Sequence, residues 1–132
     1  MRTAVDSSVL WCLINREPTA EAWDTLLRQA ASEGELTVCP LVFAELAPAY
    51  ADADVLLTDL RRLTIRYDPF TPAAAHLAGQ VFKEYRLAGG PREHLIPDFL
   101  VAAHAQIQAD RLAAADRGYL RRYFPQLPLL TP

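Results

Sequence analysis

The sequence has few of the features that mark a membrane protein or a secreted one. No apolar run approaches the roughly 20 residues that a membrane-spanning helix needs. An acid, Asp6, interrupts the first apolar segment early, which is not typical of a secretory signal. Cys12 and Cys39 are the only cysteines and both lie in apolar segments, so we expect reduced, buried thiols. Together these features predict a cytoplasmic protein without a membrane anchor.

Positive charge is also scarce. The chain has 13 Lys and Arg against 16 Asp and Glu, which gives a formal net charge of -3. A protein that holds nucleic acid only by neutralising phosphates is normally basic. The charge therefore argues against a simple DNA-binding module. It is compatible with a metal-dependent nuclease, in which a bound cation offsets the acids locally.

Several common active-site motifs are missing as well. The sequence contains no phosphate-binding loop, no dinucleotide glycine fingerprint and no Gly-x-Ser-x-Gly turn. Its two cysteines and three histidines do not have the spacing of a zinc site. Nucleotide-binding, serine-hydrolase and zinc-site interpretations are therefore disfavoured.

The sequence does contain enough apolar residues for one folded domain over residues 1–132. Hydrophobic residues make up 52% of the chain, so a sizeable core can be buried. Short apolar segments alternate with stretches of helical periodicity. We predict strands at 3–6, 36–39, 64–67, 111–114 and 127–130, the last at a sheet edge. This alternation predicts a three-layer α/β/α fold with a central, mainly parallel sheet of four to five strands.

Four acids are the candidate active-site residues: Asp6, Glu45, Asp98 and Asp116. Asp6 and Asp116 follow predicted strands, Glu45 lies in the helix after the second strand, and Asp98 lies in the first turn of the helix before the fourth strand. Ligands of open α/β sheets collect beyond the carboxyl ends of the strands. We therefore expect the four side chains to converge at that edge.

Each acid also has a structural explanation. Asp6 is a good N-cap, Asp98 is favoured by the dipole at a helix start, and Asp116 is an ordinary turn residue. Glu45 stands in an apolar run, where a buried carboxylate is costly without a partner. A helix can nevertheless turn one Glu to solvent, so the argument rests on the four acids together.

Carboxylates gathered in one pocket repel one another unless a cation lies between them. Mg²⁺ and Mn²⁺ prefer oxygen ligands, and Mg²⁺ keeps several waters while taking one or two carboxylates directly. Such a site suits hydrolysis of a phosphodiester, because the metal activates a water and stabilises the charge that develops. A Mg²⁺- or Mn²⁺-dependent nuclease is the chemistry that this pattern favours.

The ordered acidic segments resemble those of a known family. The four segments are Thr3-Ala4-Val5-Asp6-Ser7-Ser8, Cys39-Pro40-Leu41-Val42-Phe43-Ala44-Glu45-Leu46, Ile96-Pro97-Asp98-Phe99-Leu100-Val101-Ala102-Ala103-His104-Ala105 and Leu112-Ala113-Ala114-Ala115-Asp116. They resemble the four acidic motifs of PIN-domain ribonucleases, in particular the VapC toxins of bacterial toxin–antitoxin pairs. The resemblance covers nearly the whole chain.

The resemblance implies a PIN-like fold and a Mg²⁺- or Mn²⁺-dependent endoribonuclease in which Asp6, Glu45, Asp98 and Asp116 bind the metal. It also implies that Ser7 or Ser8 holds a water or a carboxylate, that the protein is a homodimer, and that a small cognate antitoxin silences it.

Two positions depart from the family pattern. Ala114 replaces a hydroxyl residue before the last acid, and Cys39 replaces Ser or Thr at the entry of the third helix. Both changes remove supporting hydrogen bonds, which weakens metal affinity. A PIN-like RNA- or protein-binding module that has lost catalysis is therefore the alternative. A small aspartate-dependent phosphatase ranks lower, because Ser8 occupies the place of its second acid.

Other residues are candidates for binding substrate or partner. Arg86, Arg92 and Arg117 flank the acids in sequence and could clamp RNA phosphates, although each is as readily a solvated surface side chain. Arg121 and Arg122 are expected on an exposed helix face. The helices through Ile14 and Trp23 are strongly apolar, and an exposed part of that surface would suit a partner helix.

Overall fold

Five short parallel strands form the centre of the molecule, in the order β3-β2-β1-β4-β5. The computed structural model describes residues 1–91, 94–115 and 118–132. The strands are β1 (Thr3–Val5), β2 (Leu36–Val38), β3 (Ile65–Tyr67), β4 (Arg111–Ala113) and β5 (Leu129–Leu130). All neighbouring pairs run parallel, and β5 lies at an edge, as predicted.

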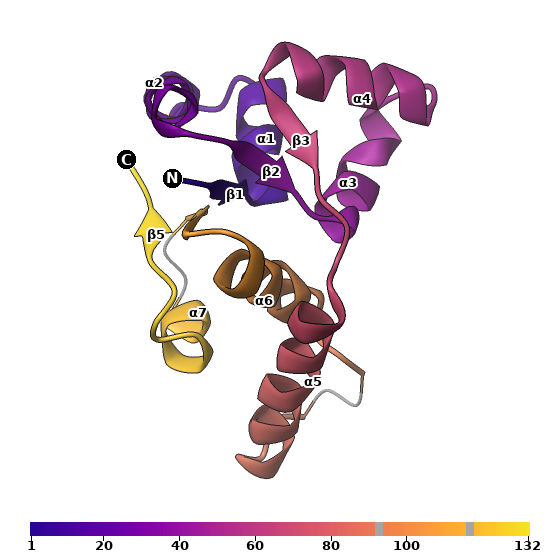
Figure 1. Cartoon of the computed structure of the whole chain (residues 1–132), viewed down its shortest axis with the longest axis vertical. Helices are drawn as coiled ribbons and strands as arrows, with labels where there is room; N and C mark the ends of the chain where they lie inside the picture. Colours follow the sequence, from indigo (N-terminus) through magenta and orange to yellow (C-terminus); the bar gives the residue numbers. More distant parts are fainter. Residues whose placement is uncertain (92–93, 116–117) are drawn as a thin grey trace.

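Helices cover both faces of this sheet, so the predicted three-layer α/β/α fold is confirmed. Figure 1 shows α1 to α4 on one side and α5, α6 and α7 on the other, with α5 extending away from the sheet. The helices are α1 (Ser7–Ile14), α2 (Ala20–Glu33), α3 (Pro40–Leu46), α4 (Ala53–Arg62), α5 (Pro72–Leu87), α6 (Pro97–Gln108) and α7 (Gly118–Tyr123), with a short 3₁₀ turn, η1 (Ala47–Ala49).

Local sequence explains where several helices begin and end. Asp52 caps α4 by accepting a hydrogen bond from the Val55 N–H at 2.9 Å, and Thr71 caps α5 in the same way. Proline occupies the first turn of α3, α5 and α6, where its missing N–H costs nothing. Pro48 ends α3 one turn after Glu45, and the chain continues as η1.

The predicted strands at 3–6 and 36–39 are each one residue too long. Asp6 and Cys39 have extended backbone angles but serve as N-caps of α1 and α3. A residue in that position has strand-like dihedrals and belongs to the helix that follows. The pattern of apolar residues alone therefore places the end of each of these strands one residue too late.

Helix α6 is buried between the sheet and α5. Phe99 and His104 are 1% exposed, and Ala102, Ala103 and Ala105 are wholly buried. The small alanine side chains let the backbone of α6 approach its neighbours on more than one side. Asp98, in the first turn of α6, is thereby held at a defined place beside the sheet.

The strand order places β1 at the centre and sets where a site can form. The chain runs from β1 outward through β2 to β3 and then returns to place β4 on the other side of β1. Ligand sites in parallel sheets lie beyond the carboxyl ends of strands at such a reversal. The Asp6 N–H donates to the Ala113 carbonyl at 3.0 Å, so the ends of β1 and β4 are adjacent there. No helix within the described ranges is both long and apolar enough to cross a membrane.

Candidate active site

Asp6 directly follows the central strand and is only 6% exposed. Within the described residues its side chain caps no backbone N–H of α1, so the N-cap explanation does not account for the carboxylate. Instead, Asp6 Oδ2 accepts a hydrogen bond of 2.5 Å from the Ser8 hydroxyl. This hydrogen bond orients the Asp6 carboxylate.

Glu45 is joined to the same segment by the neighbouring serine. Ser7 Oγ donates to Glu45 Oε1 at 3.1 Å, which links the start of α1 to the last turn of α3. Glu45 is exposed, because α3 turns this residue out of its apolar run. Burial, with a smaller contribution from the charge of Glu45, raises the pKa of the Cys39 thiol at the end of β2. Glu45 therefore lies over the carboxyl end of β2, beside that of β1.

Asp98 belongs to a helix on the other side of the sheet. It is half-buried in the first turn of α6, after Pro97, and α6 packs against both β1 and α3. The convergence of Asp98 with Asp6 and Glu45 stays a prediction.

Three of the predicted site residues, Asp116, Arg92 and Arg117, lie outside the described residues. Of the others, Asp6 and Glu45 are linked through two consecutive serines, since Ser8 bonds to Asp6 and Ser7 bonds to Glu45. The described part of the chain contains no group of three His, Cys, Asp or Glu side chains placed to hold one metal ion. The four-acid metal centre accordingly remains a prediction.

The donor chemistry at this edge nevertheless fits a hard divalent cation. Asp6 and Glu45 provide carboxylate oxygens, and Ser7 and Ser8 provide hydroxyl oxygens. Mg²⁺ is commonly held by one or two carboxylates plus waters, so a pair of acids is sufficient for such a site. Oxygen ligands of this kind favour Mg²⁺ or Mn²⁺ over softer metals.

The two departures from the family pattern have visible structural counterparts. Cys39 is 1% exposed and, within the described residues, its side chain makes no capping hydrogen bond to α3. Ala114 is also 1% exposed, and its N–H pairs with the Leu130 carbonyl at 3.3 Å. Both positions are apolar packing sites here, so each lacks the hydroxyl that would orient an acid.

A fifth acid, Asp68, escaped the sequence reasoning although it also follows a strand. Its carboxylate accepts hydrogen bonds from Arg66 at 3.2 Å, from His104 Nε2 at 2.9 Å and from Gln108 at 3.0 Å. Because a carboxylate only accepts, the His104 Nε2 must carry the proton in this pair. His104 is 1% exposed, and its pairing with Asp68 had no sequence signal.

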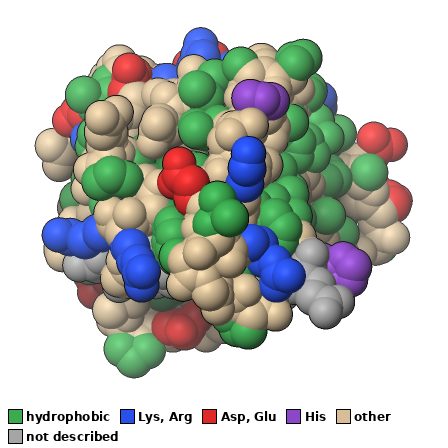
Figure 2. Space-filling model, turned by 90° about the horizontal axis from the view of Figure 1, so that it is seen from below, with side chains coloured by type: hydrophobic (Ala, Val, Ile, Leu, Met, Phe, Trp, Pro, Cys, Tyr) green, Lys and Arg blue, Asp and Glu red, His purple; other side chains and the backbone are tan. Residues whose placement is uncertain are grey.

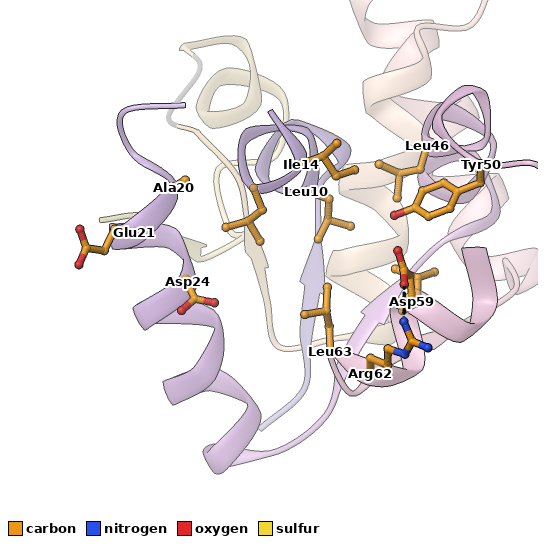
Figure 3. Close-up of a pocket in the computed structure, with 12 residues that line it drawn as sticks. Leu10, Ile14, Ala20, Glu21, Asp24, Leu46, Tyr50, Asp59, Arg62 and Leu63 are labelled. Atoms are coloured by element: carbon orange, nitrogen blue, oxygen red, sulfur yellow. Dashed lines mark hydrogen bonds and ion pairs between the residues drawn. The ribbon is translucent and has the colours of Figure 1, made fainter. Parts of the chain in front are cut away.

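An apolar groove lies between α1, α2, α4 and the end of α3, with a volume of about 530 Å³. Its apolar wall consists of Leu10, Leu13, Ile14, Leu46, Leu60 and Leu63. Three acids, Glu21, Asp24 and Asp59, and one cation, Arg62, also line it, as Figure 3 shows. Asp59 pairs with Arg62 at 3.4 Å, and burial together with Asp59 raises the pKa of the Tyr50 hydroxyl. The first helix contributes apolar residues to this groove, as predicted, whereas the Trp23 side chain of the second helix is buried in the core.

Comparisons with known proteins agree with this architecture. The family model described as "PIN domain" matches residues 3–125. VapBC2 from Rickettsia felis, solved bound to a DNA fragment from its promoter, is 18% identical with a TM-score of 0.72, covering 98% of both chains. VapBC-1 from nontypeable Haemophilus influenzae is 15% identical with a TM-score of 0.70, covering 98% of this chain and 97% of that one.

FitAcB from Neisseria gonorrhoeae is 20% identical with a TM-score of 0.69, covering 98% of this chain and 97% of that one. At these identities the likeness concerns the fold. No curated protein matches the sequence.

Proposed function

This chain belongs to the PIN-domain family, and from that premise we propose that it is a metal-dependent endoribonuclease, the toxin of a VapBC-type toxin–antitoxin pair. The observation that carries the proposal is the pairing of Ser8 with Asp6 and of Ser7 with Glu45 beside the end of the central strand. Two consecutive serines thereby orient two acids, one that directly precedes α1 and one in α3. Folds of this class bind ligands beyond the carboxyl ends of their strands.

The chain's own residues have distinct roles in this proposal. Asp6, Glu45, Asp98 and Asp116 hold Mg²⁺ or Mn²⁺, and Ser7 and Ser8 fix the orientation of two of these carboxylates. When bound, the metal activates a water and neutralises charge on the phosphate that is attacked. Arg92 and Arg117 contact RNA phosphates. The burial of Asp6 keeps bulk water away from one side of the site.

The apolar groove is the proposed docking site of the antitoxin. Its leucine wall suits the apolar face of an amphipathic helix, and its three acids against one arginine favour a helix with Lys or Arg along its edges. The similar structures are those of VapBC2, VapBC-1 and FitAcB, which supports a second protein as partner. We also propose that the protein is cytoplasmic and forms a homodimer.

Cleavage of RNA with added Mg²⁺ or Mn²⁺ tests the proposal directly. The parent protein is expected to cut single-stranded RNA with metal and to lose that activity with EDTA. Melting with Mn²⁺ provides the second readout, because a ligand that binds only the folded state raises its stability. A protein that neither cuts RNA nor gains stability with Mn²⁺ would instead be the binding module that Ala114 and Cys39 suggest.

A further inference from the structure

Five aromatic rings from α5, α6 and the segment around α7 form one cluster. Its members are Phe82, Tyr85, Phe99, Tyr123 and Phe124, whose neighbouring ring centroids lie 5.5–6.1 Å apart. Phe99 is buried at its centre, and Tyr123 is half-buried at its edge. The Tyr123 ring is held by Phe99 at 5.5 Å and by Tyr85 at 5.9 Å, so it is a rigid aromatic group that reaches the surface.

Arg122 extends this rigid group. Its guanidinium lies 5.2 Å from the centroid of the Tyr123 ring, within the range of a cation–π contact, and Arg122 itself is exposed. A planar guanidinium over a fixed ring offers a flat surface of the kind on which an unstacked base can lie. The tyrosine and arginine are adjacent in sequence and come from the last two residues of α7.

The Arg122–Tyr123 pair packs against the start of α6, the helix turn that carries one of the proposed metal-binding acids. Phe99 contacts Tyr123 and directly follows Asp98 in α6. The pair and Asp98 are therefore anchored by the same turn of one helix.

The charge of the surrounding surface also differs from that of the whole protein. Among the charged residues of α5 and α7 are four cations, Lys83, Arg86, Arg121 and Arg122, and one acid, Glu84. All five are exposed, whereas the whole chain carries a net charge of -3. Figure 2, which views the molecule from the end where α5 and α7 lie, shows Lys and Arg side chains spread across this face.

We propose that Arg122 and Tyr123 form a stacking position for a base of single-stranded RNA next to the bond that is cut, with Lys83 and Arg121 near the flanking phosphates. This inference rests on the proposed ribonuclease function and names the residues that give it base preference. Stacking tolerates every base but favours those that stack more strongly. Purines at this position are therefore preferred over pyrimidines. Duplex RNA, whose bases are not exposed, is excluded from it.

Binding of a fluorescent single-stranded RNA oligonucleotide, measured by anisotropy in EDTA, separates stacking from cleavage. Tyr123→Leu is expected to weaken binding about tenfold, because losing one stacked base costs of this order. Tyr123→Phe keeps the ring and should bind as the parent does. Arg122→Gln should weaken binding severalfold and reduce its salt dependence, whereas Arg61→Gln, an exposed arginine on α4, should change neither.

Parental affinity in Tyr123→Leu, or equal losses in Arg122→Gln and Arg61→Gln, would overturn the proposal. If Tyr123→Leu does not melt as a folded protein, Arg122→Glu at an exposed position decides, and an unchanged affinity there also overturns it. A parent that binds RNA through Tyr123 but cuts none with Mg²⁺ would contradict the nuclease and support the stacking position. If Tyr123→Leu cuts RNA with the parental KM and base preference, the nuclease proposal stands and the stacking proposal is overturned.

Discussion

Two aspartates in this protein each directly follow a strand of the sheet but have very different surroundings. Asp6 directly follows β1 and Asp68 directly follows β3, and both are largely buried, at 6% and 9% exposure. Asp68 accepts hydrogen bonds from an arginine, a histidine and a glutamine, and Asp6 accepts one from the Ser8 hydroxyl. The bonds of Asp68 tie β3 to α6 across the fold, whereas the Ser8 bond ties Asp6 to the start of the helix that follows it.

The region around Asp68 is a structural joint. Gln108 bonds to Asp68, to the Pro69 carbonyl and to the Thr71 N–H, so it ties the connection between β3 and α5 to the end of α6. Arg66 also pairs with Glu35 at 3.2 Å, next to the start of β2. Arg66, and to a lesser degree Arg2, lowers the pKa of Glu35. Here arginines neutralise acids, and the joint ties β3 to the start of β2 and to the end of α6.

Removing the Asp6 charge should have the largest effect on activity. Asp6→Asn is expected to reduce Mg²⁺-dependent RNA cleavage by roughly 100-fold or more, because a lost metal ligand removes several kcal/mol of transition-state stabilisation. Its melting temperature without metal should be unchanged or higher, since charge repulsion is relieved. Asp54→Asn, an exposed acid in the first turn of α4, is the matched control. Cleavage by Asp6→Asn at the parental rate would contradict the assignment.

Removing Asp68 should have the opposite effect: a large loss of stability with little change in metal binding. Asp68→Ala leaves the buried His104 without its acceptor and removes one acceptor of Gln108, which costs about 2–3 kcal/mol of the free energy of unfolding. Urea unfolding measures this loss, and Asp54→Ala again serves as the control. At a temperature where the variant is folded, its Mn²⁺ affinity should equal that of the parent. A loss of metal binding with unchanged stability would reverse the distinction between Asp6 and Asp68.

Ser7 should have an intermediate effect on activity. Ser7→Ala removes the hydrogen bond that orients Glu45, and the loss of such a supporting contact commonly costs about tenfold in activity or metal affinity. Stability should be nearly unchanged, because Glu45 is exposed. Ser32→Ala, which removes the hydroxyl bond to the Gln29 carbonyl on the surface of α2, controls for losing a hydroxyl. Equal cleavage by Ser7→Ala and the parent would show that this contact is only structural.

The smallest expected effect is a pH dependence of stability at the Asp68 joint. Burial lowers the pKa of His104 below its usual 6.5, although its contact with Asp68 acts in the opposite direction. Below about pH 6.5 the unfolded chain therefore binds a proton that the folded chain does not. The free energy of unfolding should be constant above pH 7 and fall on acidification from 6.5 toward the lowered pKa.

Urea unfolding at pH 7.5, 6.5 and 5.5 checks this dependence. His104→Gln keeps a side-chain donor near Asp68 and removes the titration, so its stability should change less over this interval. The exposed carboxylates titrate at lower pH and affect both proteins equally. Identical slopes in the parent and His104→Gln would show that another group causes the dependence.

Much of the fold could be predicted from local pattern. The five strands and the helices between them were found because apolar periodicity, proline at helix starts and capping side chains such as Asp52 and Thr71 act within a few residues. The strand ends at Asp6 and Cys39 were misplaced because N-cap residues have strand-like dihedrals. Asp6 and Glu45 were found as candidates, but their link through Ser7 and Ser8 was not. The role of Asp68 had no local signal.

The sequence by itself determined which segments are strands and helices, that they form a parallel three-layer domain, and which acids belong to the family motifs. These properties depend on contacts between residues close together in the chain, or on an order of motifs that can be read directly. Only the tertiary structure decided which carboxylate meets which donor. Residues 36 and 40 positions apart, such as Asp68 with His104 and Gln108, come together through strand order and helix packing, and no short-range pattern records that.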